Sequence, residues 1–228
     1  MKRQTFLIDA DDTLWENNVF FEKAIAEFVS RMEPLGYSAA YVRRILNEVE
    51  KRNIRQHGYG VASFRRSVEE TYRRLAGELA RSDEWAWIRD RARELEMTPP
   101  HVLEGVPETL AFLARRHRLI LFTKGEPAEQ APKIERSGLV NYFEAVEIAP
   151  EKDRVSYEHV VRRHKIVKQN AWMVGNSPRS DVNPALEAGL NVVFIPHPMT
   201  WELEHAELAC GTGRMLLLTS FRDLRKHF

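Results

Sequence analysis

The sequence is poor in cysteine, in net charge and in long hydrophobic runs. Cys210 is the only cysteine among 228 residues, so no disulfide can form within the chain, and a reducing compartment is the simpler interpretation. The net charge is +1, whereas proteins that bind nucleic acid usually have a strongly basic face. No window approaches the roughly 18 consecutive apolar residues that a transmembrane helix needs. These absences give no reason to expect a nucleic-acid or membrane partner.

The N-terminus does not have the pattern of a signal peptide. Basic residues at 2–3 precede an apolar stretch, but the acidic segment 9–12 interrupts it, so the stretch is not a proper hydrophobic region. The chain also offers no zinc pattern, because Cys210 stands alone, and His197 is expected to belong to a loop rather than to bind a metal. We therefore expect a cytoplasmic protein that is a monomer or a homodimer.

The segment 19–97 is predicted to be helical, with short breaks. Ser38 has the position of an N-cap, because apolar residues then recur at helical spacing over 41–49. Ser82 opens another helix, and acidic residues in its first turn suit the positive end of the helix dipole. Glycines within 57–60 mark a break between helices, since glycine punctuates helical patterns.

After residue 98 the pattern changes to helices that alternate with short apolar runs. A helix with Pro107 in its first turn opens this half of the chain. Short continuous apolar runs separated by helical segments indicate a parallel sheet buried on both faces. With one run near the N-terminus, the predicted strands are 6–8, 119–122, 145–148, 172–174, 192–195 and 215–218. The predicted fold class is therefore α/β, with a Rossmann-like parallel sheet flanked by helices.

The most informative segment follows the first predicted strand and reads Asp9-Ala10-Asp11-Asp12-Thr13-Leu14. Two carboxylates would lie where this strand ends, and ligands and catalytic groups gather at the carboxyl ends of strands in open α/β sheets. Asp-x-Asp with Thr two residues later resembles the signature of the haloacid dehalogenase superfamily, most of whose members are phosphate-ester hydrolases. A helical insert after the first strand resembles the layout of the members that have a helical cap.

The resemblance implies a domain division and the roles of two aspartates. The division is a Rossmann-like core domain over 1–17 and 98–228 and an all-helical cap domain over 18–97. Asp9 would be the nucleophile that forms an aspartyl-phosphate. Asp11 would protonate the leaving oxygen and then activate the water that hydrolyses the intermediate. The alternative for Asp11 and Asp12 is that they cap a helix or a turn.

Two further segments match positions at which the family binds phosphate. Thr123 ends a predicted strand, where its hydroxyl can donate to a phosphate oxygen, and Gly125 lets the backbone come close. The resemblance makes 123–125 a substrate-binding segment that includes Lys124, although the Lys124 side chain is expected to face solvent. Lys152, just beyond the next predicted strand, is expected to neutralise the nucleophile and the substrate phosphate.

Lys152 is preferred over the other lysines because of its place after a strand. Lys133, Lys165 and Lys168 lie within or after helical stretches, where a solvated charge is the ordinary outcome. The usual family pattern has proline directly after this lysine, whereas Asp153 follows it here.

The loop 175–181 resembles the family's metal-binding segment. The family generally places an acidic residue after the glycine, but this chain has Asn176, whose amide oxygen can ligate a hard cation without bringing negative charge. Asp181 matches the second acidic position. The resemblance therefore implies Mg²⁺ held by Asp9, the backbone carbonyl of Asp11, and Asn176 or Asp181, together with water and the substrate phosphate.

The leading interpretation is a Mg²⁺-dependent phosphatase that acts on a small phosphorylated metabolite. Alternatives are a phosphosugar mutase, a 2-haloacid dehalogenase, and a catalytically weak member with a binding or regulatory role. Asp11 argues against the dehalogenase, which has no leaving alkoxide to protonate, whereas Asn176 fits the dehalogenase slightly better than the phosphatase.

The break between the helices at 57–60 falls where this family often places its substrate-specificity loop. The helical stretch around it has an excess of basic residues, most of which are expected to be solvated. Arg52, Arg55 and Tyr59 are the residues expected to contact the leaving group of the substrate.

Overall fold

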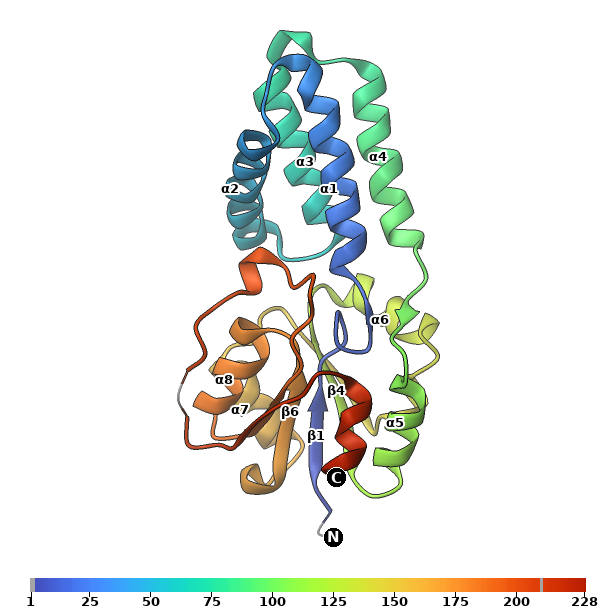
Figure 1. The fold of residues 1–228 in the computed structure, drawn as a ribbon, viewed down its shortest axis with the longest axis vertical. Coiled ribbons are helices and arrows are strands. Elements are labelled where there is room, and N and C mark those ends of the chain that lie inside the picture. The colour runs from blue at the N-terminus through green and yellow to red at the C-terminus, as the bar shows by residue number, and fades with distance from the viewer. Residues whose placement is uncertain (1–2, 210) are drawn as a thin grey trace. The chain divides into compact units, whose positions relative to one another are not determined.

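The computed structural model describes residues 3–209 and 211–228. The first two residues and Cys210, on which the interpretation of a reducing compartment rests, lie outside the described residues. The chain divides into two compact units, one formed by residues through Asn18 together with Pro100–Phe228 and the other by Val19–Pro99. Figure 1 traces both units along the chain. Within the described part, no helix combines the length and the apolar character that crossing a membrane requires.

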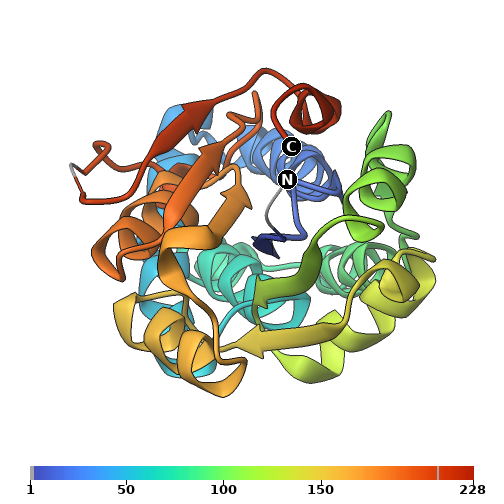
Figure 2. The ribbon, with the colours of Figure 1, turned by 90° about the horizontal axis from the view of Figure 1, so that it is seen from below.

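The first unit contains a six-stranded parallel sheet in the order β5-β4-β1-β6-β7-β8. Counted along the chain, this order is 3-2-1-4-5-6, so the chain reverses direction across the sheet between β1 and β6. Figure 2 looks at the sheet from below, with β1 in blue between β4 in green and β6 in orange. The strands are β1 (Thr5–Ile8), β4 (Arg118–Lys124), β5 (Ala145–Ala149), β6 (Ala171–Gly175), β7 (Asn191–Phe194) and β8 (Met215–Leu217). The predicted α/β fold with a Rossmann-like sheet is confirmed.

Alternating side chains of β1 enter two separate hydrophobic clusters because successive residues of a strand point to opposite faces. Phe6 and Ile8 pack on the face covered by α5, α6 and a C-terminal 3₁₀ helix. Leu7 packs on the opposite face, against α7 and α8. These elements are α5 (Val106–Ala114), α6 (Pro127–Arg136), α7 (Arg154–Arg163), α8 (Asn183–Glu187) and the 3₁₀ helix Phe221–Lys226. Burial on both faces explains why the strands appear in the sequence as continuous apolar runs.

A small antiparallel pair accompanies the main sheet. It joins β2 (Trp15–Glu16) to β3 (His101–Val102), with Trp15 opposite Val102. Trp15 is fully buried. The pair was not expected from the sequence, because strands of two residues are too short to show alternation. It fixes the loop that carries the aspartates after β1.

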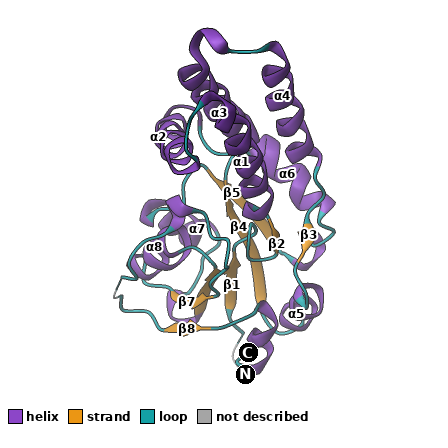
Figure 3. Ribbon diagram, turned by 45° about the horizontal axis from the view of Figure 1, so that its top comes forward, coloured by secondary structure: helices purple, strands orange, loops and turns teal. Residues whose placement is uncertain are grey.

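The second unit is built from helices, which Figure 3 draws in purple. They are α1 (Asn18–Met32), α2 (Ala39–His57), α3 (Val61–Ala76) and α4 (Ser82–Met97), of which α1 starts at the last residue of the first unit. Ser38 is the N-cap of α2, since its hydroxyl accepts a hydrogen bond from the backbone N–H of Tyr41. Gly58 and Gly60 have φ of +74° and +112°, values that favour glycine and end α2 at the predicted break.

Candidate active site

Three segments that are distant in the sequence meet at the point where the sheet changes direction. Asp9 directly follows β1, and its backbone N–H donates to the carbonyl of Val174 on β6 at 2.9 Å. The Lys152 ammonium lies 2.5 Å from Asp9 Oδ1 and 2.6 Å from Asp181 Oδ1. It also donates to the carbonyl of Phe122 on β4, at 3.1 Å. Lys152 thus connects the ends of three adjacent strands.

The Asp9–Lys152–Asp181 cluster is buried and has one more negative charge than positive when both carboxyls are ionised. Asp9, Lys152 and Asp181 are 6%, 3% and 1% exposed. Burial, reinforced by the charge of Asp181, raises the pKa of Asp9 to about 7. Burial acts to lower the pKa of Lys152, but the two carboxylates outweigh it and raise the pKa, so this lysine stays charged. With both carboxyls ionised, one further positive charge would make the cluster neutral.

Gly175 makes room for Asp181. A Cβ atom at Gly175 would lie 2.2 Å from Asp181 Oδ2, a distance that no real structure accommodates. This carboxylate oxygen accepts a hydrogen bond of 2.9 Å from the backbone N–H of Ser177, while Oδ1 is paired with Lys152. Asp181 therefore holds both the lysine and the loop after β6.

Thr13 links Asp9 to Asn176. Its hydroxyl oxygen lies 3.1 Å from Asp9 Oδ2 and 3.2 Å from Asn176 Oδ1, and one hydroxyl proton can serve only one of them at a time. The Asn176 amide nitrogen donates to Thr200 Oγ1 at 3.4 Å, which keeps the amide oxygen on the side of Thr13. The sequence motif contains Thr13, but nothing in its spacing indicated this bridge.

Asp11 accepts hydrogen bonds from three side chains. Trp15 Nε1 and Lys133 Nζ lie 2.7 and 2.5 Å from its Oδ1, and Gln130 Nε2 lies 3.0 Å from its Oδ2. Burial acts to raise the pKa of Asp11, but Lys133, Gln130 and Trp15 outweigh it, so the pKa lies below its ordinary value.

The prediction that Lys133 is a solvated charge is wrong. Its ammonium is bonded to Asp11 and, at 2.5 Å, to Asn17 Oδ1. The reason is that Gln130 and Lys133 lie one turn apart on α6 and therefore share the face that meets Asp11. Asp12, in contrast, does cap: one of its carboxylate oxygens accepts from the backbone N–H of Asn17 at 2.8 Å, and the carboxylate also accepts from Asn18.

The Lys124 side chain does not face solvent, contrary to the prediction. It is 12% exposed, and its ammonium lies 2.5 Å from Glu204 Oε1 and 2.9 Å from Ser180 Oγ. Glu204 also accepts from the hydroxyls of Ser177 and Ser180, both at 2.5 Å. Glu204 belongs to the 3₁₀ helix Glu202–Glu204, 80 residues further along the chain, so local sequence could not reveal the pair.

The neighbours of Lys124 complete the predicted substrate-binding segment. Thr123 is buried near the end of β4, opposite Ile148 of β5. Gly125 has φ of +137°, and a Cβ there would lie 3.2 Å from the Gln130 side chain. Glycine at this position therefore provides space for Gln130 as well as the backbone conformation.

Glu204→Gln is expected to destabilise the protein by about 2 kcal/mol at pH 7, because the variant loses charge-assisted hydrogen bonds. Burial acts to raise the pKa of Glu204, but Lys124, Ser177 and Ser180 lower it from 4.5 to about 2. The ionised carboxylate therefore stabilises the fold fully above about pH 5, and this contribution disappears as the pH falls towards 2. Urea unfolding across this range would test the expectation, with the exposed Glu207→Gln as control. A difference between wild type and variant that does not shrink in acid would contradict it.

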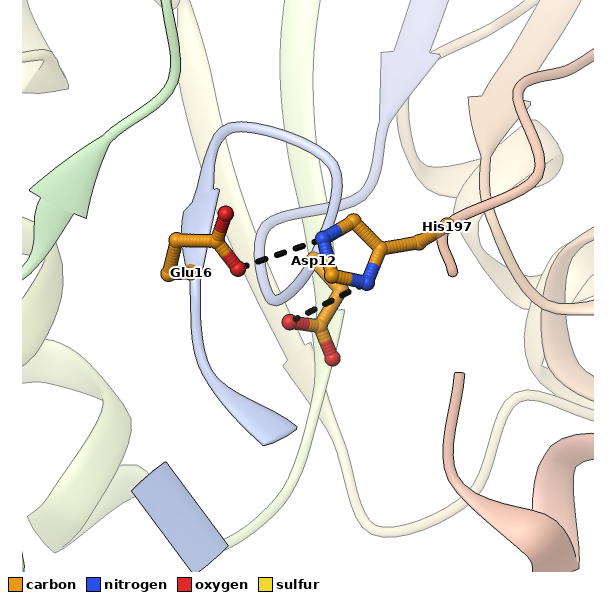
Figure 4. A group of neighbouring side chains, drawn as sticks. All are labelled: Asp12, Glu16 and His197. Atoms are coloured by element: carbon orange, nitrogen blue, oxygen red, sulfur yellow. Dashed lines mark ion pairs between the residues drawn. The ribbon is translucent and has the colours of Figure 1, made fainter. Parts of the chain in front are cut away.

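His197 lies in a loop, as expected from the sequence, and joins that loop to β2 (Figure 4). Its Nε2 is 3.2 Å from Glu16 Oε2, and its Nδ1 is 4.0 Å from Asp12 Oδ1. The three side chains could bring one ligand atom each within 4.8 Å of one another. However, His197 Nδ1 already accepts the backbone N–H of Met199 at 3.2 Å, and Asp12 accepts from backbone N–H groups. We interpret this group as a structural tie.

Asp153, at the position after Lys152 where the family usually has proline, caps the helix that follows. Its carboxylate accepts from the backbone N–H of Ser156 at 2.8 Å, and the Ser156 hydroxyl lies 3.0 Å from the backbone nitrogen of Asp153. This reciprocal pair is a capping box at the start of α7. The N-cap of α7 therefore directly follows Lys152, and the helix begins at Arg154.

The predicted leaving-group residues all belong to the helical unit. Arg52 lies on α2 and forms an ion pair with Glu70 of α3. Arg55 lies one turn later on α2 and is exposed, and Tyr59 stands between Gly58 and Gly60. Their contact with a substrate stays a prediction.

Three features together define a class of hydrolases. They are a doubly wound sheet, an aspartate–lysine pair at the point where the strand order reverses, and a helical insert after the first strand. The chain belongs to the haloacid dehalogenase-like hydrolase family, whose model matches residues 4–189.

Two curated relatives are phosphatases by name. The chain is 32% identical to the phosphoserine phosphatase of Thermus thermophilus over 141 residues, which are 58% of this chain and 52% of that protein. It is 27% identical to enolase-phosphatase E1 of Chaetomium globosum over 106 residues, 46% of this chain and 41% of that protein. The matches thus span about half the length of these relatives.

Solved structures resemble the whole chain. A haloacid dehalogenase-like hydrolase from Xanthomonas campestris has a TM-score of 0.85 and 28% identity, with 99% of this chain and 94% of that chain covered. The HAD-hydrolase YfnB from Bacillus subtilis, bound to magnesium, has a TM-score of 0.66 and 17% identity, with 100% and 99% covered. L-2-haloacid dehalogenase from Xanthobacter autotrophicus, with chloropropionic acid covalently bound, has a TM-score of 0.65 and 17% identity, with 99% and 98% covered. At 17% identity, the last two likenesses concern the fold alone.

Proposed function

We propose that this hydrolase is a Mg²⁺-dependent phosphatase that acts on a small phosphate monoester through an aspartyl-phosphate on Asp9. The observation that carries the proposal is the contrast between two aspartates two residues apart. Asp9, directly after β1, is buried and paired with Lys152, and we assign it as the nucleophile. Asp11 lies two residues further on, its carboxylate accepts from Trp15, Gln130 and Lys133, and we assign it to proton transfer.

The proposed reaction has two steps. A carboxylate oxygen of Asp9 attacks phosphorus, and the bond from phosphorus to the leaving oxygen breaks while Asp11 gives that oxygen a proton. In the second step, Asp11 takes a proton from water while the water oxygen attacks phosphorus. The bond between phosphorus and Asp9 breaks, which releases inorganic phosphate and restores the Asp9 carboxylate. Lys152 pairs with Asp9 and offsets negative charge. Thr123, buried near the end of β4, would donate to a phosphate oxygen.

The residues fit a magnesium ion. The available donors are hard oxygens, which Mg²⁺ prefers, and the Asp9–Lys152–Asp181 cluster lacks one positive charge. Asp9, the backbone carbonyl of Asp11 and the amide oxygen of Asn176 would hold the ion. Both carboxylate oxygens of Asp181 are already bonded, one to Lys152 and the other to Ser177, so we propose that Asp181 does not bind the ion directly. When bound, the ion would supply positive charge beside the phosphoryl oxygens.

Two parallel assays test this function. The first measures release of p-nitrophenol from p-nitrophenyl phosphate with Mg²⁺ and with EDTA. The second measures release of chloride from L-2-chloropropionate, because Asn176 fits a dehalogenase slightly better than a phosphatase. Mg²⁺-dependent phosphatase activity without chloride release is expected. Chloride release without phosphatase activity would replace the proposal, and a slowly decaying phosphoenzyme that returns phosphate to a sugar would favour a mutase.

Asn176→Asp is expected to lower the Mg²⁺ concentration that gives half-maximal activity, because a carboxylate attracts a divalent cation more strongly than an amide does. A Mg²⁺ titration of the steady-state rate measures the shift. The matched control is Asn141→Asp, an exposed asparagine of the same unit. An unchanged titration would remove Asn176 from the ligands and make Asp181 the better candidate.

Single alanine substitutions of Arg52, Arg55 and Tyr59 are expected to raise KM for natural phosphate esters and to change their ranking. Small aryl phosphates should respond less, since they have few groups for a specificity loop to contact. Arg44→Ala is the control, because Arg44 is also an ion-paired arginine of α2. Equal losses on both kinds of substrate would show that the segment serves folding or loop closure instead.

A further inference from the structure

The carboxylate of Asp11 is held by a set of three donors, Trp15 Nε1, Gln130 Nε2 and Lys133 Nζ, here called the Asp11 clamp. Trp15 belongs to β2, and Gln130 and Lys133 belong to α6. The clamp is therefore assembled from two elements that are separated in the sequence by the whole helical unit.

Each donor is itself fixed by a second contact. Gln130 Nε2 also donates to the backbone carbonyl of Lys124, at 3.1 Å. Lys133 Nζ also donates to Asn17 Oδ1 and lies 5.9 Å from the centre of the Trp15 ring. The Trp15 side chain is fully buried. The carboxylate plane of Asp11 is therefore determined by groups that cannot easily move.

The clamp treats the two oxygens of Asp11 differently. Oδ1 accepts from both Trp15 and Lys133, which occupies its two lone pairs. Among the residues that the structure describes, Oδ2 accepts from Gln130 alone, so one lone pair of this oxygen stays open. The Asp11 side chain is 23% exposed, so solvent reaches this side chain. Of the three side chains that donate to Asp11, Gln130 alone also carries an acceptor atom, Oε1. This oxygen is buried and has no hydrogen-bond partner within the described structure.

The geometry points to Lys133 and Gln130 as positioning residues for Asp11. They make Oδ2 the single oxygen through which Asp11 gives a proton to the leaving group and takes a proton from water. This inference rests on the proposed phosphatase reaction and deepens it. Neither residue touches the substrate. They act by fixing the direction of the open lone pair on Asp11 Oδ2. Misplacing a catalytic group by about 1 Å can reduce a rate by roughly 10²-fold.

Lys133→Met tests the inference on two substrates. With p-nitrophenyl phosphate, whose leaving group needs no proton, kcat/KM should stay within about twofold of wild type, while kcat falls at least about tenfold because water activation is slowed. A phosphoenzyme should therefore accumulate, visible as a burst of p-nitrophenol and as phosphate on the Asp9 peptide after acid quench. With an alkyl phosphate, which needs the proton, kcat/KM should fall at least about tenfold.

Further variants separate positioning from folding. Gln130→Ala should give the same pattern in a weaker form, and Lys133→Arg, which keeps the charge and a donor, should recover most of the activity. Arg136→Met, which removes an exposed cation of the same helix, should behave as wild type. Equal losses of kcat/KM on both substrates, or wild-type kinetics in Lys133→Met, would overturn the inference. If neither wild type nor Asp11→Asn ever forms a phosphoenzyme on Asp9, the proposed function itself fails, whatever the clamp does.

Discussion

Asp9→Asn is expected to abolish turnover while the protein stays folded. The substitution removes the attacking oxygen, and the reaction has no other route through a covalent intermediate. The remaining Lys152–Asp181 pair is balanced in charge, since one buried cation faces one buried anion. The midpoint of thermal unfolding should therefore be at least as high as that of the wild type.

Steady-state assays with p-nitrophenyl phosphate and acid-quench detection of phosphate on the Asp9 peptide measure this effect. Asp90→Asn, an exposed aspartate of α4, is the control for the loss of a carboxylate. Full activity in Asp9→Asn would end the phosphatase hypothesis in its covalent form. Retained activity with no labelled peptide would instead indicate direct attack by water.

Lys152→Met is expected to have the second largest effect, because it removes both activity and stability. It leaves the Asp9 and Asp181 carboxyls buried side by side without a cation, and breaking a buried pair in this way costs about 3–5 kcal/mol. Part of this cost is relieved if one carboxyl takes up a proton, which also removes the nucleophile. Urea unfolding at pH 7 and the phosphatase assay measure the two losses.

A double variant separates these two losses. Lys152→Met combined with Asp181→Asn leaves one carboxyl, that of Asp9, in the buried cluster, so much of the stability should return, whereas activity should not. Lys165→Met, an exposed lysine of the same unit, controls for the loss of a cation. Wild-type stability in Lys152→Met alone would mean that the buried cluster is not held together by this charge.

The sequence was informative wherever the chemistry is local to a strand end. Strands buried on both faces leave continuous apolar runs, and these runs predicted all six strands of the main sheet to within two residues. The carboxyl ends of parallel strands meet at one edge of a sheet, and the family resemblance assigns Asp9, Lys152 and Asp181, which follow such runs, to one site. The structure brings these three side chains together.

The sequence was uninformative where a side chain finds its partner across the chain. Lys133 was assigned to solvent because a lysine in a helix is normally solvated, and only the packing of α6 against the loop after β1 brings it to Asp11. Lys124, the last residue of β4, is likewise expected from the sequence to face solvent, although its ammonium pairs with Glu204. Periodicity reports which face of a helix is apolar, and it contains no information about a polar group that will meet another one.

The division of the first unit into two stretches of chain has a consequence for synthesis. β1 lies in the middle of the sheet, and its partners are Arg118–Leu121 on one side and Ala171–Val174 on the other. A ribosome makes β1 first but makes both neighbouring strands only after the entire helical unit, whose own contacts, such as Arg31 with Glu84, join residues closer in sequence than β1 and its partners. Pairing over such separations is slow compared with local helix packing, and domains generally fold as units, starting from the N-terminal end, during synthesis. The helical unit is therefore expected to fold while the apolar segment that will become the centre of the sheet is still exposed, which makes that segment the natural target of a chaperone.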